Sequence, residues 1–146
     1  MKTKQQLIDA IVTQFQKTEL YRDDRIQWVE AAFDDSWHGD LEPQIAIDPD
    51  GYRLLLYERG IQIMNKKISP EREHDIIYWI LDSRIQTAAY LELLDRHGIE
   101  SGKGHLQMTA TVQAEWSALI RRAFAATDDI YEEMYRSGKR GELEQM

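Results

Sequence analysis

Apolar residues recur at helical spacing near the N-terminus of this 146-residue chain. The segment 4–17 carries an apolar set that would lie on one face of a helix: Leu7, Ile8, Ile11, Val12 and Phe15. The spacing predicts an amphipathic first helix. A weaker pattern at Ile26, Val29 and Phe33 predicts a short second helix, and we interpret the acid-rich "DDSWHGD" after it as a loop.

The hydrophobic period changes to two after residue 43. Ile45 and Ile47 alternate with other residues, and Asp48-Pro49-Asp50-Gly51 is typical of a tight turn. A second strand follows, and Glu58-Arg59-Gly60 then separates it from the alternating "IQIMNKKI". Gly60 can supply the positive φ of a short hairpin loop. Three short strands joined by two tight turns predict an antiparallel meander.

Helical periodicity returns at Ser69-Pro70, which is typical of a helix start. The pattern runs to about His97, and Tyr78 and Trp79 occupy positions compatible with a core. After a polar linker, a last helix is expected from Thr109 or Thr111 to Ser137-Gly138, with Trp116 and Ile130 on its inner face.

The tail at 138–146 is predicted to fray. The chain is therefore expected to form one domain over 1–146. The predicted fold class is α+β, with an N-terminal helix, a three-stranded meander and two long C-terminal helices packed on one face.

Charge and composition narrow the classes of function. The net charge is −8 and the pI is about 5.0, which argues against direct binding to nucleic acid or an anionic membrane. The chain has no cysteine, and its four histidines lack metal-ligand spacing, so we predict no metal and no cofactor. The N-terminus lacks the apolar stretch of a signal peptide, which makes the cytoplasm the expected location.

The negative charge is concentrated between Glu19 and Asp50, where ten acidic residues face only Arg22 and Arg25. The segment is either a solvated acidic surface or an interface for a basic protein. In the second interpretation, Trp37 is the anchor. Trp28 is assigned instead to a helix packed on the core. The carboxylates proposed to contact the partner are Asp23, Asp24, Glu30, Asp34, Asp35, Asp40 and Glu42.

Glu58 and Arg59 allow two interpretations. In the first, they belong to a hairpin turn with a salt bridge, and replacing either by alanine lowers stability. In the second, they are part of a small enzyme that uses them with Arg84 or Arg96 on an anionic substrate. The second interpretation lacks a nearby His, Ser or second carboxylate in sequence.

"GYRLLLYERG" followed by "DIIYWILDSRIQTAAYLELLDR" resembles the immunity protein 63 family of bacterial polymorphic toxin and contact-dependent growth inhibition systems. The resemblance covers roughly residues 43–135. The linker after Gly98 and the acidic segment 19–42 depart from the family pattern. The matching positions are Tyr52, Glu58, Arg59, Gly60, Asp75, Tyr78, Trp79, Ile80, Ala89, Tyr90 and Arg96.

The resemblance implies a protein that is not an enzyme and that binds and blocks a cognate toxin domain in the cytoplasm. Many such toxins are nucleases, and nucleases are basic because they bind phosphate backbones. Glu58-Arg59-Gly60 and Tyr78-Trp79 would then be shared scaffold, and the acidic surface would select the toxin. The free protein is expected to be a monomer or a weak dimer. A general regulatory adaptor is the remaining alternative.

Overall fold

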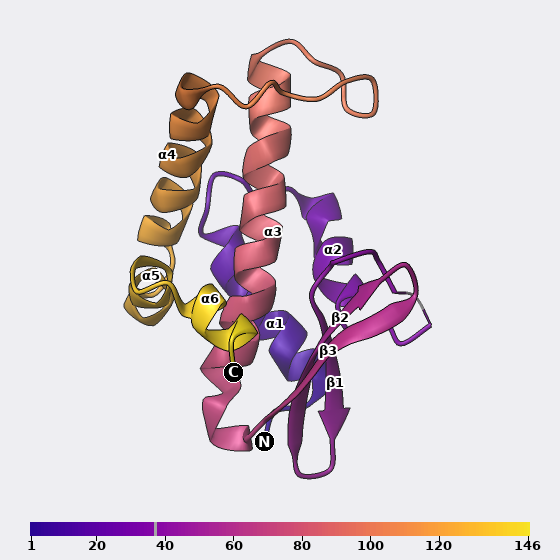
Figure 1. The fold of residues 1–146 in the computed structure, drawn as a ribbon. Coiled ribbons are helices and arrows are strands. Elements are labelled where there is room, and N and C mark those ends of the chain that lie inside the picture. Colours follow the sequence, from indigo (N-terminus) through magenta and orange to yellow (C-terminus); the bar gives the residue numbers. More distant parts are fainter. Residues whose placement is uncertain (37) are drawn as a thin grey trace.

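The fold class predicted from the sequence is confirmed. The structure, a computed structural model, describes residues 1–36 and 38–146 and has an α+β architecture (Figure 1). N-terminal helices precede a three-stranded antiparallel meander, and the long helices α3 and α4 come afterwards. In chain order the elements are α1 (Lys4–Gln16), η1 (Asp23–Arg25), α2 (Ile26–Ala31), β1 (Gln44–Asp48), β2 (Gly51–Glu58), β3 (Ile61–Ile68), η2 (Pro70–Arg72), α3 (Glu73–Arg96), α4 (Ala110–Ala126), α5 (Asp129–Arg136) and α6 (Lys139–Glu144).

The first helix begins at a capping box. The Thr3 hydroxyl accepts the Gln6 N–H, and the Gln6 side chain accepts the Thr3 N–H, so two backbone donors at the helix end are satisfied. The apolar face predicted for residues 4–17 is buried along its whole length and packs against α3. Local capping and tertiary burial therefore select the same helix.

The sheet is a meander in the order β1-β2-β3, and both of its turns have two residues, as the turn signals predicted. Arg59 and Gly60 have φ angles of 51° and 78°, the double positive φ of a type I′ hairpin turn. Gly51 is required for another reason: a Cβ atom there would lie 2.6 Å from the carbonyl oxygen of Ile68. This glycine lets β2 and the end of β3 approach closely.

Helix α3 is the centre of the molecule. It has 24 residues and packs against α1, α2, α4, α5 and α6, as Figure 1 shows. Its N-terminal half is buried on nearly all sides, and Tyr78 and Trp79 are fully buried, which confirms their predicted core positions. Trp28, in α2, is partly buried against the same core, as expected.

The predicted last helix is wrong in one respect, because it is two helices. The chain leaves the helical conformation at Thr127, whose ψ is 176°, and α5 begins after Asp128. The break rotates the buried face: Ile130, expected inside, is 40% exposed, and Tyr131 is buried in its place. Gln14 of α1 holds the break, because its Nε2 donates to Asp128 Oδ2 at 2.8 Å and its Oε1 accepts the Asp128 N–H at 2.9 Å.

The prediction of a frayed tail at 138–146 is also wrong. Residues 139–144 form α6, whose Leu143 side chain is fully buried. Arg140 Nη1 donates to Asp82 Oδ2 at 2.9 Å, and Lys139 Nζ lies 3.4 Å from Asp75 Oδ1. Two buried carboxylates of α3 therefore hold a segment whose own sequence is too polar and short to predict a helix.

Candidate functional site

Ion pairing divides the ten carboxylates between Glu19 and Asp50 into two groups. Three of them pair with cations from outside the segment: Glu19 with Arg122 at 2.5 Å, Asp48 with Arg53 at 2.6 Å and Asp50 with Lys67 at 2.6 Å. The other seven are exposed and form no ion pair with any described residue. These seven are the carboxylates proposed from the sequence as partner contacts.

Trp37, the proposed anchor, lies outside the described residues. Its neighbours on both sides are described, and they lie where the segment after α2 approaches the sheet. Asp34 and Asp35 precede it, and His38 follows it. All three line one cavity, which makes this cavity the candidate site.

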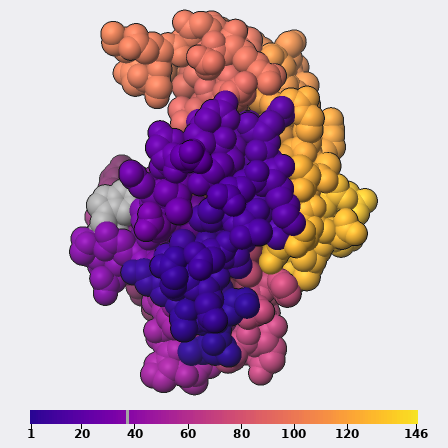
Figure 2. Space-filling model, turned by 180° about the vertical axis from the view of Figure 1, so that it is seen from behind, coloured from indigo at the N-terminus to yellow at the C-terminus, as the bar shows by residue number. Residues whose placement is uncertain are grey.

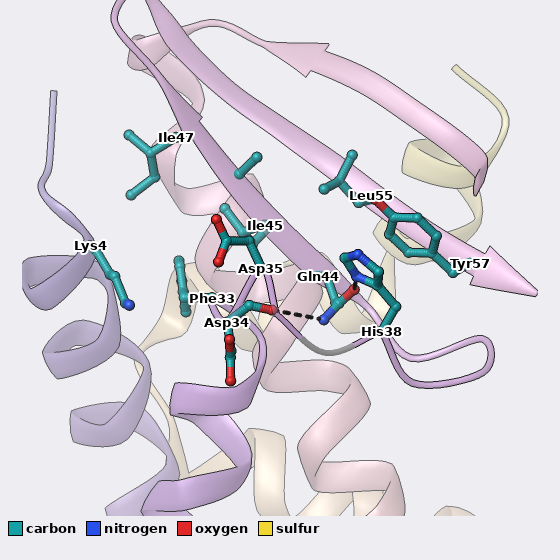
Figure 3. A pocket seen from close by; sticks show the side chains of 11 residues that line it. Lys4, Phe33, Asp34, Asp35, His38, Gln44, Ile45, Ile47, Leu55 and Tyr57 are labelled. Carbon is teal, nitrogen blue, oxygen red and sulfur yellow. Dashed lines mark hydrogen bonds between the residues drawn. The ribbon is translucent and has the colours of Figure 1, made fainter. Parts of the chain in front are cut away.

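The cavity has a volume of about 420 Å³ and lies between α1, the segment after α2 and strands β1 and β2 (Figure 3). Lys4 enters from α1. The sequence interpretation missed the apolar lining, since these residues were assigned only to strands and the core. That lining consists of Phe33, Ile45, Ala46, Ile47 and Leu55. Acidic side chains around an apolar lining suit a group that is cationic at one point and apolar elsewhere.

Asp34 is held as a carboxylate. Its Oδ1 accepts hydrogen bonds from the Ser36 N–H at 2.9 Å and from the Ser36 hydroxyl at 2.6 Å. The hydroxyl bond lowers the pKa of Asp34 most, with smaller contributions from the N–H and from the charges of Lys4 and His38. The charge at this position is therefore fixed in place.

His38 forms one wall of the cavity. Its ring stacks on Tyr57, with centroids 3.9 Å apart and planes 16° apart, and its Nδ1 lies 2.8 Å from Gln44 Oε1 (Figure 3). An amide oxygen only accepts, so Nδ1 is the protonated nitrogen of this contact. The backbone oxygen of Asp34 accepts from Gln44 Nε2 at 3.4 Å. These contacts tie the segment after α2 to the sheet.

The seven unpaired carboxylates do not form one patch. Glu30 and Asp34 line a second cavity of about 480 Å³, which shares Lys4 and Asp34 with the first. Asp23 and Asp24 lie in η1, and Glu42 lines a third cavity beside Arg84. Seen from behind, the segment that follows α1 forms a large part of the surface (Figure 2). The acidic residues therefore lie on different elements, and the two adjoining cavities gather only part of them.

Asp40 has a local structural role. Its Oδ1 accepts the N–H of Arg59 at 2.8 Å, and its backbone forms an isolated bridge with Tyr57. This aspartate therefore anchors the β2–β3 turn as well as adding charge. The salt bridge expected at this turn is absent among the described residues, because neither Glu58 nor Arg59 forms an ion pair there.

The other residues that carry the family resemblance lie mainly in the core. Tyr52 is fully buried, and its hydroxyl oxygen accepts the backbone N–H of Lys2 at 2.9 Å. Ile80 and Ala89 are buried in α3. Trp79 Nε1 has no hydrogen-bond acceptor among the described residues. Tyr90 contacts Trp116 edge to face, Asp75 binds Arg72, and Arg96 binds Glu92 on the surface. Most of these positions support packing.

The residues of the enzyme interpretation are separated in space. Glu58 and Arg59 lie at the β2–β3 turn, whereas Arg84 lies in the middle of α3, where its Nε donates to the Trp28 carbonyl at 3.0 Å. Arg96 is twelve residues further along α3, about 18 Å at the usual helical rise. Glu58 and Arg59 line none of the three cavities described above. None of these cavities brings Glu58 or Arg59 together with Arg84 or with Arg96, as this interpretation requires.

Comparisons with protein-family models, with curated proteins and with solved structures found no match for this chain. Within residues 1–36 and 38–146, no helix combines the length and the apolar composition needed to cross a membrane. In the same residues, no group of three or more His, Asp or Glu side chains converges as in a metal centre.

Proposed function

We propose that this chain is an immunity protein that binds and neutralises a cognate toxin domain in the cytoplasm without catalysing a reaction. The toxin domain is expected to be basic, as nucleases are. The proposal rests on seven exposed carboxylates without an ion-pair partner in the described structure, two of which, Asp34 and Asp35, line a cavity with an apolar lining. The resemblance of roughly residues 43–135 to the immunity protein 63 family, although no family model matches the chain, is what points to a toxin as the partner.

Unpaired carboxylates carry a cost in the free energy of folding. The chain has a net charge of −8, and repulsion among its like charges lowers the stability of the folded state. Three neighbouring carboxylates have cations from outside the segment beside them, so suitable partners exist in this fold. A basic partner would remove the repulsion, and the charges would speed its association. The cavity beside Asp34 and Asp35 would accept a side chain of that partner.

The test is binding kinetics with the toxin domain encoded by the adjacent gene. An Asp34→Lys/Asp35→Lys variant should mainly slow association, and added salt should do the same to the wild type. A Trp37→Ala variant should mainly speed dissociation, costing on the order of 2 kcal/mol if this side chain is a buried anchor.

Glu71→Lys/Asp95→Lys is the matched control, since it changes the net charge by the same amount at two exposed carboxylates that form no ion pair with described residues and line neither cavity at the site. Its association rate should fall much less than that of the Asp34/Asp35 variant. Equal slowing in both would mean that only net charge matters, and wild-type kinetics in all three variants would remove the acidic segment from the interface. No binding between the wild-type chain and the adjacent toxin would overturn the immunity function itself.

A further inference from the structure

Arg84 is a buried cation without a direct ion pair among the described residues, although Glu42 lines the same cavity. Its side chain belongs to α3, the residue is 5% exposed, and it forms no ion pair with any described residue. Burying an unpaired charge is costly, so such a residue calls for an explanation. Burial lowers the pKa of Arg84 to about 10, while the charge of Glu42 acts in the opposite direction, and the guanidinium is still charged at neutral pH.

Two hydrogen bonds fix the plane of the guanidinium. Nε donates to the Trp28 carbonyl at 3.0 Å, and Nη1 donates to the Ser83 hydroxyl at 3.1 Å. A guanidinium carries five N–H donors in a planar fork. Among the described residues no acceptor is present for the Nη2 donors, so one edge of the fork is available to a ligand.

Arg84 lines a cavity of about 340 Å³ between α2 and α3, which lie side by side in Figure 1. This volume is at the lower end of the range of small-ligand sites, roughly 300–1,000 Å³. Trp28 and Ala31 supply apolar surface, and Ser83 supplies a hydroxyl that donates to no acceptor among the described residues. Glu42 lines the same cavity and opposes a second negative charge there.

We propose that this cavity binds the carboxylate of a small organic acid, with Arg84 as its cationic anchor and Trp28 against its apolar body. A guanidinium edge matches a carboxylate in a bidentate manner. Glu42 already offsets the charge of Arg84 in this cavity, so the two hydrogen bonds to the free guanidinium edge are what would hold a monoanion, and a dianion such as phosphate is disfavoured. This site is separate from the cavity at Asp34 and Asp35 and does not depend on the proposed immunity function.

The experiment is a titration of the wild-type protein with benzoate at constant ionic strength, followed by NMR. The Arg84 Nε–H and Trp28 indole signals should shift together and saturate, with a dissociation constant roughly in the millimolar range of small fragments. Benzyl alcohol has a similar shape without the charge and should bind at least tenfold more weakly. Acetate, which mimics the end of an acidic protein side chain, should also bind more weakly because it lacks the apolar body.

Three variants locate the site. Arg84→Gln should lose at least tenfold in benzoate affinity, and Glu42→Gln should bind more tightly because it removes a competing carboxylate. Arg122→Gln on α4 is the matched control and should bind like the wild type, since Arg122 is exposed and paired with Glu19.

If Arg84→Gln fails to fold, the benzoate titrations of the wild type and of Glu42→Gln still test whether the cavity binds a carboxylate. Absence of saturable shifts, equal affinity for benzyl alcohol, acetate binding as tightly as benzoate, or weaker binding by Glu42→Gln would each overturn the proposal.

Discussion

At the β2–β3 turn, Arg59 and Gly60 contribute through their backbone conformation and not through side-chain contacts. Both residues have positive φ, but only glycine adopts it without steric cost, which is about 1–2 kcal/mol for other residues. Arg59 is held at the turn by a hydrogen bond from its backbone N–H to Asp40 Oδ1. Its side chain and that of Glu58 form no ion pair with described residues, so the stability once expected from such a pair has no basis in this fold.

The prediction at the residue scale is that Gly60→Ala lowers the free energy of unfolding by about 1 kcal/mol. Glu58→Ala and Arg59→Ala should each change it by less than about 0.5 kcal/mol, as exposed surface substitutions do. Arg59→Asn should be neutral or stabilising, because Asn-Gly is the preferred type I′ pair. Urea denaturation of the four variants measures this. A large loss in Glu58→Ala or Arg59→Ala with Gly60→Ala unchanged would contradict it.

Helix α6 illustrates how a weak element is stabilised by buried charge. It has six residues and contains Gly141, so it has little intrinsic helical stability. Its Arg140 reaches Asp82, which is 1% exposed and also accepts from Gln86 Nε2 at 3.1 and 3.0 Å. Breaking a buried ion pair leaves a charge in the core, a cost that is larger than the net value of the pair.

At the element scale we therefore predict that Arg140→Ala lowers the free energy of unfolding by about 3 kcal/mol. Leu143→Ala should cost about 2–5 kcal/mol, because its side chain is fully buried. Arg136→Ala, whose ion pairs are exposed, is the control and should cost less than about 1 kcal/mol. Chemical denaturation gives all three values. If the Arg140 and Arg136 variants were equally stable, α6 would not be held by its ion pair.

The whole molecule carries its negative charge unevenly, and this can be tested without a partner. Asp35 forms no ion pair with a described residue, whereas Asp48 in the same segment lies 2.6 Å from Arg53. Neutralising an unpaired carboxylate in an acidic environment relieves repulsion, and neutralising a paired one removes attraction. Both effects are screened by salt.

Asp35→Asn is therefore predicted to raise the free energy of unfolding at low ionic strength by roughly 0.5 kcal/mol, and Asp48→Asn to lower it by a similar amount. Both differences from the wild type should shrink in high salt. Thermal or urea unfolding at two ionic strengths provides the comparison. If the two variants shifted stability in the same direction, the distinction between paired and unpaired carboxylates would be wrong.

The amino-acid sequence by itself determined the elements whose signals are local. The apolar face at 4–17, both tight turns and the meander were predictable, because periodicity and turn chemistry act over a few residues. The helix start predicted at Ser69-Pro70 is wrong in its boundary, because Pro70–Arg72 form the 3-10 turn η2 and α3 begins at Glu73. The concentration of acidic residues between Glu19 and Asp50 was also evident from the sequence. Hydrophobic periodicity does not indicate which of these carboxylates form ion pairs.

Only the tertiary structure decided the features that depend on distant residues. Gln14 binds Asp128 across 114 positions and ends α4, and Asp82 binds Arg140 across 58 positions and holds α6. The pairing of Glu19 with Arg122 is of the same kind. A cavity likewise forms only when separate elements meet around it. Sequence periodicity reports which face of an element is apolar, and chain folding alone sets which charges, hydrogen-bond donors and apolar surfaces that face will meet.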